Sequence, residues 1–496
     1  MFENLALGFA AFGDPYVWLG LLVGALAGYL IGAIPGLGPS LGVALLIPFT
    51  YGMDPVVAIV MLVALYAAAE YGGAITAVLI NTPGTAAAVA TAWDGYPLTR
   101  QGKAGIALNL SIIGSGIGIL VSSVLLVVTA IPLSELALNF GPGEYFALAV
   151  VGLSLVSGLS EGSVLKGAIA MGLGLALATV GLDTQTGIPR FAYSPEFFEG
   201  FPLVPVLLGL YALSEVLFML EEGPAQKIKS QKITGILAVP FSAYYKLRGH
   251  LIRSSLLGYV IGVIPGAGAS IASFMSYIVA KKTSKEPEKF GKGSYEGLVA
   301  SETANNAAVS GALAPLLALG IPGSATTAVL IGALMIQGIQ PGPLLFTRNP
   351  EIPYSIFASL FIGVPVMIVI GLAGARLWAQ VANIPRPAIA AIVATICLIG
   401  AYASSNSIFP VFIMTAFGVI GYVLRKARIP LAPIILALVL GDMMETNFRR
   451  AMVISRGSYD IFYTHPLTLI LLIVAVLAFV VPLVNDIRAK RRARRV

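Results

Sequence analysis

Apolar stretches recur along the whole chain and are separated by short polar segments. A helix needs about 20 predominantly apolar residues to cross a bilayer, and with their flanks many of these stretches approach that length. They cover residues 17–30, 56–69, 106–131, 145–155, 165–180, 204–220, 251–264, 356–372, 388–401, 408–423, 431–440 and 467–484. The pattern predicts an all-α integral membrane protein with about 11–12 transmembrane helices plus re-entrant helical hairpins.

Two Pro-Gly motifs interrupt these stretches, and each motif occurs twice. Ile31–Ser40 (IGAIPGLGPS) returns as Ile261–Ser270 (IGVIPGAGAS) at an offset of 230 (265 − 35), and Asn81–Thr85 (NTPGT) returns as Gly320–Ser324 (GIPGS) at an offset of 239 (322 − 83). The chain therefore contains two related halves. We place the first transmembrane repeat at residues 1–232 and the second at 233–496, divided after the polar stretch 221–232. Interrupted segments at corresponding positions of two halves indicate a transporter binding site, and we expect the two repeats to be inverted.

The motifs supply chemistry for binding both an anion and a cation. Proline lacks an N–H group and glycine lets the backbone turn, so each pair breaks its helix. Carbonyls before the break suit a cation such as Na⁺, and the half-helix start after it presents N–H donors to an anion. The predicted substrate-binding residues are Gly36, Gly38, Ser40, Asn81, Thr82, Pro83, Gly84, Thr85, Gly266, Gly268, Ser270, Pro322, Gly323, Ser324 and Thr326, with Thr327 nearby. The alternative is that the motifs are kinks that let helices pack closely; four of them in two matched pairs favour the site.

Two acids lie within apolar segments, where a charge is costly and usually functional. Glu70 precedes the first hairpin motif, and Glu302 has Asn305 and Asn306 on the same helix face, three and four residues on. These residues are candidates for ion coupling, as carboxylates beside Na⁺ or as protonatable groups. Equally, each acid can anchor a hairpin by hydrogen bonds to exposed backbone, and the sequence leaves both readings open.

For the coupling ion itself, the sequence favours oxygen ligands at the hairpin breaks. We expect a metal site for Na⁺ at Asn81, Thr82 and Ser324, because a carbonyl-rich break suits a hard cation. No other cofactor is expected.

Other polar residues have structural interpretations. Asp54-Pro55 is typical of a helix N-cap followed by proline at the first helical position. Asp94 to Pro97 is predicted to form a turn that Asp94 stabilises. The late cluster of Asp442, Glu445 and Arg449 with its neighbours is predicted to be a structural ion-pair network or a subunit contact.

Composition and charge agree with a multi-pass membrane protein. Hydrophobic residues make up 57% of the chain and charged residues 11%, whereas soluble proteins carry about 25% charged residues. Basic segments at 281–292, 425–428 and 488–495 are expected in the cytoplasm, with the C-terminus, and the acidic loop 182–200 outside. The net charge of +7 reflects this topology, and no nucleic-acid partner is expected.

Enzyme signatures are missing from the sequence. There is no G-x-x-x-x-G-K-[ST] phosphate loop and no H-E-x-x-H, and the only histidines, His250 and His465, lie near the ends of predicted spans. The single cysteine, Cys397, lies in an apolar run and excludes a disulfide within the chain. We therefore expect no catalytic residues.

The ordered motifs resemble those of the large permease subunit of the tripartite tricarboxylate transporters, the TctA family. The resemblance rests on the repeated PGxG motifs, Asn81–Thr85, Trp93–Pro97 and Ser301–Asn306, and it runs from Gly20 to the C-terminus. It implies a bacterial inner-membrane subunit that works with a small membrane subunit and a periplasmic solute-binding protein. It further implies import of an organic anion, coupled to an ion gradient, by an elevator-like movement. The alternative functions are an anion channel or a carboxylate permease that needs no binding protein.

Overall fold

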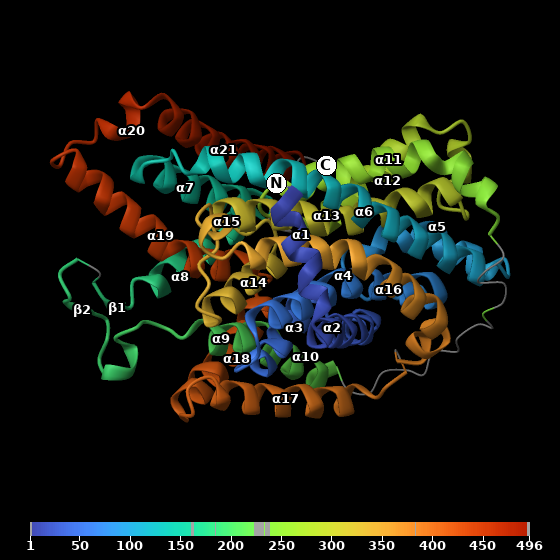
Figure 1. Cartoon of the computed structure of the whole chain (residues 1–496), viewed down its shortest axis with the longest axis horizontal. Coiled ribbons are helices and arrows are strands. Elements are labelled where there is room, and N and C mark those ends of the chain that lie inside the picture. Colours follow the sequence, from blue (N-terminus) through green and yellow to red (C-terminus); the bar gives the residue numbers. More distant parts are fainter. Residues whose placement is uncertain are drawn as a thin grey trace. The chain divides into compact units, whose positions relative to one another are not determined.

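The computed structural model of the chain describes residues 2–159, 163–183, 185–222, 233, 239–381 and 383–493. Within this part, regular structure is almost entirely helical, and the strands form a single two-residue pair (Figure 1). This confirms the predicted all-α membrane class. The predicted division between the halves falls largely on residues 223–232, outside the described residues, and stays a prediction.

The chain folds into two compact units, and each unit combines segments from both halves of the sequence. Unit 1 comprises Met1–Ser134 with Phe218–Ile396, and unit 2 comprises Glu135–Leu217 with Cys397–Val496. The two compact units therefore do not coincide with the two sequence repeats.

Unit 1 holds the four Pro-Gly motifs. Its helices are α1 (Phe2–Ala10), α2 (Pro15–Ala33), α3 (Pro39–Leu46), α4 (Pro55–Ile80), α5 (Ala88–Arg100), α11 (Phe241–Val263), α12 (Gly268–Thr283), α13 (Tyr295–Leu319), α14 (Ala325–Ile336), α15 (Leu345–Arg348) and α16 (Glu351–Val381). Short 3₁₀ turns are η1 (Ala11–Gly13), η2 (Ile47–Thr50) and η5 (Pro287–Lys289). Three helices cross the border between the units: α6 (Ala104–Ala137), α10 (Ser214–Glu222) and α17 (Arg386–Ala403).

Unit 2 contains the strand pair and the last helices of the chain. Its elements are α7 (Pro142–Leu159), α8 (Val164–Ala178), β1 (Gly181–Leu182), β2 (Pro189–Arg190), the 3₁₀ turn η3 (Pro195–Phe197), α9 (Leu203–Leu207), the π-helical turn η4 (Leu208–Leu213), α18 (Phe409–Lys426), α19 (Ala432–Ile454), α20 (Ile461–Thr464) and α21 (Pro466–Ala493). The strands are antiparallel, with Gly181 opposite Arg190. Helix α19 packs against α7 and α8, and α21 packs against α7.

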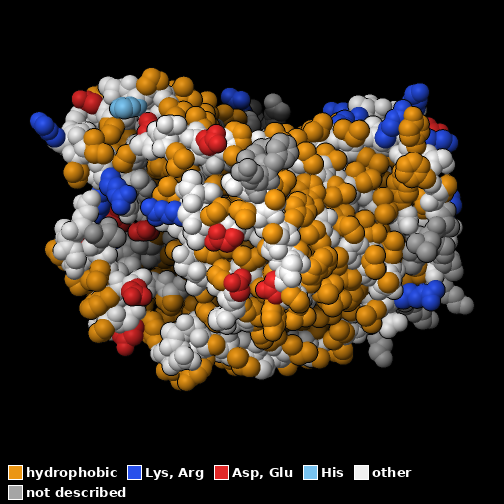
Figure 2. Space-filling view, viewed as in Figure 1, with side chains coloured by type: hydrophobic (Ala, Val, Ile, Leu, Met, Phe, Trp, Pro, Cys, Tyr) orange, Lys and Arg blue, Asp and Glu red, His pale blue; other side chains and the backbone are white. Residues whose placement is uncertain are grey.

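Eight stretches of the described chain are long and apolar enough to cross a membrane. They are Pro15–Ala33, Pro55–Ile80, Ala104–Ala137, Leu203–Glu221, Glu351–Ala373, Arg386–Ala403, Phe409–Lys426 and Pro466–Arg488. Other apolar helices are shorter, and two of them, α3 and α14, begin directly after a Pro-Gly break. Apolar side chains are spread over much of the visible surface, as expected for contact with lipid (Figure 2).

Helix α4 forms the centre of the first half of unit 1. Asp54 accepts hydrogen bonds from the N–H groups of Val56 (2.9 Å) and Val57 (3.3 Å), with Pro55 at the first helical position, which confirms the predicted N-cap. All residues from Ala58 to Leu79 are buried. A helix that is apolar on every side must be enclosed, and α2, α3, α5 and α16 enclose it.

Glycine contacts show that the two halves repeat in three dimensions. A methyl group at Gly28 would lie 2.5 Å from the carbonyl oxygen of Leu65, and one at Gly32 would lie 2.2 Å from that of Ala69. These are contacts of α2 on α4, and α11 makes the matching contacts on α13. There, a methyl group at Gly258 would lie 2.4 Å from the carbonyl oxygen of Ala304, and one at Gly262 would lie 2.6 Å from that of Ala308. The partners are related by the same offsets, 230 and 239, that relate the sequence motifs.

Candidate functional site

The first motif of each half forms a helix break of the predicted kind. Helix α2 ends at Ala33 and α3 begins at Pro39, and Gly36 between them has φ 94°. In the second half α11 ends at Val263 and α12 begins at Gly268, and Gly266 has φ 82°. L-residues with a side chain rarely adopt this region, so glycine is required at both positions.

The second motifs end α4 and α13 in the same way. Asn81 (φ 55°) and Gly320 (φ 72°) are left-handed C-caps. The next residue then reaches back, from Thr82 N to the Thr76 oxygen (3.3 Å) and from Ile321 N to the Pro315 oxygen (3.2 Å). The chain reverses, so each motif is the tip of a helical hairpin.

Within each half, the hairpin tip touches the broken helix. A methyl group at Gly84 would lie 1.9 Å from the carbonyl oxygen of Gly32, and Gly84 N donates to the Gly73 oxygen (3.1 Å). In the second half, Gly266 N donates to the Gly323 oxygen (3.1 Å). The four motifs are therefore joined pairwise through backbone groups.

The tip of the second hairpin contacts the first half. Ser324 caps α14 through a reciprocal pair of hydrogen bonds with Thr327, from Thr327 N to Ser324 Oγ (3.2 Å) and from Ser324 N to Thr327 Oγ1 (2.8 Å). The Ser324 hydroxyl also lies 3.3 Å from the hydroxyl of Tyr66, on α4. Helix α14 packs on α3, and α5 packs on α12, so each hairpin helix contacts the broken helix of the other half.

Glu302 is fully buried in α13 and accepts hydrogen bonds from hydroxyls of two other helices. Thr91 of α5 donates to one carboxyl oxygen, and Ser115 of α6 donates to the other (3.0 Å). Asn306 donates in turn to Ser115 Oγ (2.8 Å). This network joins α5, α6 and α13 through side-chain hydroxyls, whereas the anchor expected from the sequence was a hydrogen bond to exposed backbone. The ion-coupling role of Glu302 stays a prediction.

Several buried polar atoms around this network have no hydrogen-bond partner. They include one carboxyl oxygen of Glu70, the Thr85 hydroxyl and the amide oxygens of Asn305 and Asn306. Buried polar groups are normally satisfied, and leaving one unpaired costs about 1–3 kcal/mol. Unpaired atoms from three elements of one core are typical of a place that binds a ligand or an ion.

The remaining predicted residues are more dispersed. Gly36 and Asn81 are exposed, and Gly38, Ser40, Thr82, Pro83, Gly268 and Ser270 are half-buried, whereas Pro322, Gly323 and Thr326 are buried. Asn81 follows Tyr66, the neighbour of Ser324, by fifteen positions in α4, which is about 22 Å of helix. The structure therefore does not gather Asn81, Thr82 and Ser324 around one point.

The prediction for Asp94 needs correction. The expected turn at 94–97 is part of α5, which continues through Pro97 to Arg100. The Asp94 carboxylate instead accepts hydrogen bonds from the N–H groups of Gly291 (2.8 Å), Gly293 (2.9 Å) and Ser294 (2.8 Å). It therefore fixes a loop of the other half, a long-range partnership that local sequence does not reveal.

The model of the Tripartite tricarboxylate transporter TctA family matches residues 19–436. The chain belongs to this family.

Two Agrobacterium vitis proteins are similar to this TctA-family chain. The "Uncharacterized 52.8 kDa protein in TAR-I ttuC' 3'region" is 38% identical over 492 residues, which are 99% of this chain and 98% of the relative. The "Uncharacterized protein in TAR-II ttuC' 3'region" is 39% identical over 234 residues, 47% of this chain and 97% of the relative. No solved structure matches the chain.

Three site residues of this TctA-family core were not predicted from the sequence. Tyr66, Thr91 and Ser115 each contact a predicted residue, Ser324 in the first case and Glu302 in the others. Tyr66 lies four residues before Glu70, on the same face of α4, and this spacing is the one signal in the sequence that could have identified it. Thr91 and Ser115 stand among many small residues in the membrane segments and carry no distinguishing pattern.

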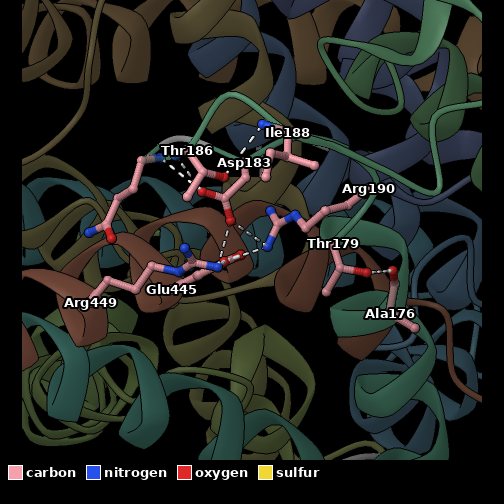
Figure 3. A network of polar contacts seen from close by, with 9 residues as sticks. Ala176, Thr179, Asp183, Thr186, Ile188, Arg190, Glu445 and Arg449 are labelled. Atoms are coloured by element: carbon pink, nitrogen blue, oxygen red, sulfur yellow. Dashed lines mark hydrogen bonds and ion pairs between the residues drawn. The ribbon is translucent and has the colours of Figure 1, made fainter.

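In unit 2, Glu445 and Arg449 of the late cluster form an ion-pair network with Asp183 and Arg190, which agrees with the structural alternative for these two residues (Figure 3). Arg449 contacts Asp183 and Glu445 (both 2.7 Å), and Arg190 contacts Glu445 (2.5 Å) and Asp183 (3.6 Å). The Thr186 N–H group, aided by further donors that include Arg449, holds the pKa of the Asp183 carboxyl well below its usual range. The ion-pair network fastens the β1–β2 hairpin to α19 and contains none of the four motifs.

Proposed function

We propose that the chain is the large membrane subunit of a binding-protein-dependent secondary transporter that imports organic anions, tricarboxylates or related carboxylates. The observation that carries the proposal is the duplicated core of a TctA-family chain. Two broken helices and two hairpin tips of matching local geometry pack around α4 and α13, with unpaired buried polar groups between them. Paired discontinuous helices of this kind are typical of substrate sites in secondary transporters.

Substrate recognition in this proposal relies on neutral donors. The four motifs contain no Lys or Arg, so the carboxylates would be held by N–H groups at half-helix starts and by hydroxyls such as those of Ser40, Ser270 and Thr326. Neutral donors bind an anion weakly enough to release it. High affinity would then come from the periplasmic solute-binding protein, with the small membrane subunit as the third component, as the word "tripartite" in the family description supports.

The proposed mechanism is alternating access in the bacterial inner membrane, driven by a Na⁺ or H⁺ gradient and without catalysis. The presence of two compact units, one of which contains all four motifs, supports an elevator-like movement of one unit as a body. The basic C-terminal segment supports a cytoplasmic C-terminus.

Uptake by proteoliposomes tests this function. The purified chain is reconstituted with its small membrane subunit, and uptake of radiolabelled carboxylates is measured with and without the binding protein. We expect saturable uptake that needs both the binding protein and an ion gradient. Uptake without the binding protein and without saturation would favour the anion channel, and saturable uptake without the binding protein would favour the independent permease.

A further inference from the structure

At one pair of corresponding positions in the core, the two halves differ in their hydrogen bonds. The offset of 239 relates Tyr66 to Asn305 and Thr85 to Ser324. On one side, the Tyr66 and Ser324 hydroxyls lie 3.3 Å apart. On the other side, the Thr85 hydroxyl and the amide oxygen of Asn305 have no hydrogen-bond partner, although Thr85 is 6% exposed and Asn305 0% exposed.

Contacts with α13 residues before and after Asn305 place the first hairpin along this part of α13. Ala87, two residues after Thr85, packs in one cluster with Ala304 and Ala308 of α13. Thr91 donates a hydrogen bond to Glu302, one turn before Asn305. Thr85 thus begins a segment that follows α13 past Asn305. An asparagine side chain is much shorter than a tyrosine, so it does not complete the bond that Tyr66 makes in the other half.

The charges around this position indicate what the unpaired groups bind. Glu302 lies beside Asn305, and Glu70 is close enough to Glu302 to interact with it electrostatically. Among the described residues, neither acid forms an ion pair with Lys, Arg or His. Two buried carboxyl groups repel an anion and attract a cation. The acceptors at hand are hydroxyl, amide and carboxylate oxygens, the ligands of hard cations.

We propose that Thr85 Oγ1 and Asn305 Oδ1 bind a monovalent cation, Na⁺, with the Glu302 carboxylate as the compensating charge. A monovalent ion matches the single carboxylate of Glu302 in charge. The site differs from the one predicted at Asn81, Thr82 and Ser324, which the structure does not gather. It rests on the proposed function in one respect only: bound Na⁺ would be the coupling ion.

Thermal unfolding of the purified full-length chain tests the site without transport. A ligand that binds only the folded state raises the unfolding midpoint, so we expect a higher midpoint in NaCl than in choline chloride of equal ionic strength. Thr85→Val removes the hydroxyl at nearly constant volume, and Asn305→Tyr copies the pairing of the other half. Both variants should fold and lose the Na⁺ response. Ser310→Ala is the control. It removes a buried hydroxyl of α13 that is hydrogen-bonded to Ser123 (3.2 Å), and this variant should keep the Na⁺ response.

The outcomes separate this site from the proposed function. No Na⁺ response in the wild type, or a full response in a folded Thr85→Val variant, overturns the site. A midpoint that follows pH and ignores Na⁺ overturns it as well, in favour of a proton on an acid. A Na⁺ response that the two variants abolish supports the site even when reconstituted protein takes up no carboxylate, a result that contradicts the proposed function alone.

Discussion

At the scale of single residues, Gly84 is the tightest point of the motif core. Its α-carbon faces the carbonyl oxygen of Gly32, and a methyl group there would also lie 2.7 Å from the Gly73 α-carbon. All of these neighbours are backbone atoms, which cannot move aside as a flexible side chain would. The corresponding Gly323 is almost as confined, with Ala312 at 2.7 Å.

We therefore expect Gly84→Ala to destabilise the protein by about 3 kcal/mol or more, the upper range for overpacking. Gly38→Ala is the matched control, because a methyl group at Gly38 meets no atom within 4 Å and its φ is −76°. The measurement is the thermal unfolding midpoint of each purified variant. Equal midpoints would show that the first hairpin tip is not packed against α2 as described.

At the scale of elements, the β1–β2 hairpin depends on charges that α19 supplies. Asp183 accepts hydrogen bonds from the N–H groups of Gln185 (3.0 Å) and Thr186 (2.9 Å) inside the hairpin, and it pairs with Arg449 outside it. Its side chain is nearly buried, so these partners stabilise the charged form. A carboxyl whose pKa is lowered by folding stabilises the fold above its unfolded pKa, about 3.9, and this contribution fades as the pH falls through the folded value.

Asp183→Asn should therefore accelerate amide hydrogen exchange in the 181–190 hairpin at neutral pH. The difference from the wild type should persist down to about pH 4 and shrink below it, where the unfolded aspartate is protonated. Asp460→Asn is the control: Asp460 is an acid of the same unit bonded to Tyr463, and its loss should leave this exchange unchanged. Identical exchange in Asp183→Asn and the wild type at pH 7 would mean that the ion-pair network does not hold the hairpin.

At the scale of the whole molecule, the internal repeat predicts on which side of the membrane two of the connections between helices lie. The turn between α3 and α4 corresponds to the longer loop between α12 and α13, where the basic residues 281–292 are inserted. If the repeats are inverted, these two connections face opposite sides of the membrane.

Cysteine labelling in intact cells measures this directly. In a Cys397→Ala background, Met53→Cys and Lys285→Cys place single thiols at exposed positions of the two connections. We expect an impermeant reagent to label position 53 from outside, and position 285 only after the membrane is opened. Labelling of both thiols from the same side would contradict inverted repeats.

The sequence predicted correctly those features that depend only on neighbouring residues in the chain. The breaks at Gly36 and Gly266 and the cap at Asp54 follow from conformational rules that depend only on residues near in the chain. Asp94 was misplaced because its three backbone donors lie about two hundred positions away. The residues around an aspartate do not show whether its carboxylate binds N–H groups of its own turn or those of a distant loop.

The sequence alone determined the membrane class, the two related halves and the four helix breaks, because hydropathy, repetition and backbone preference are properties of residues in order. Only the tertiary structure decided which residues meet. It paired Tyr66 with Ser324, enclosed Glu302 between Thr91 and Ser115, and left the Thr85 hydroxyl and the Asn305 amide oxygen without partners. The reason is physical: hydrogen bonds between helices depend on how whole elements pack, and the order of residues along the chain does not fix that packing.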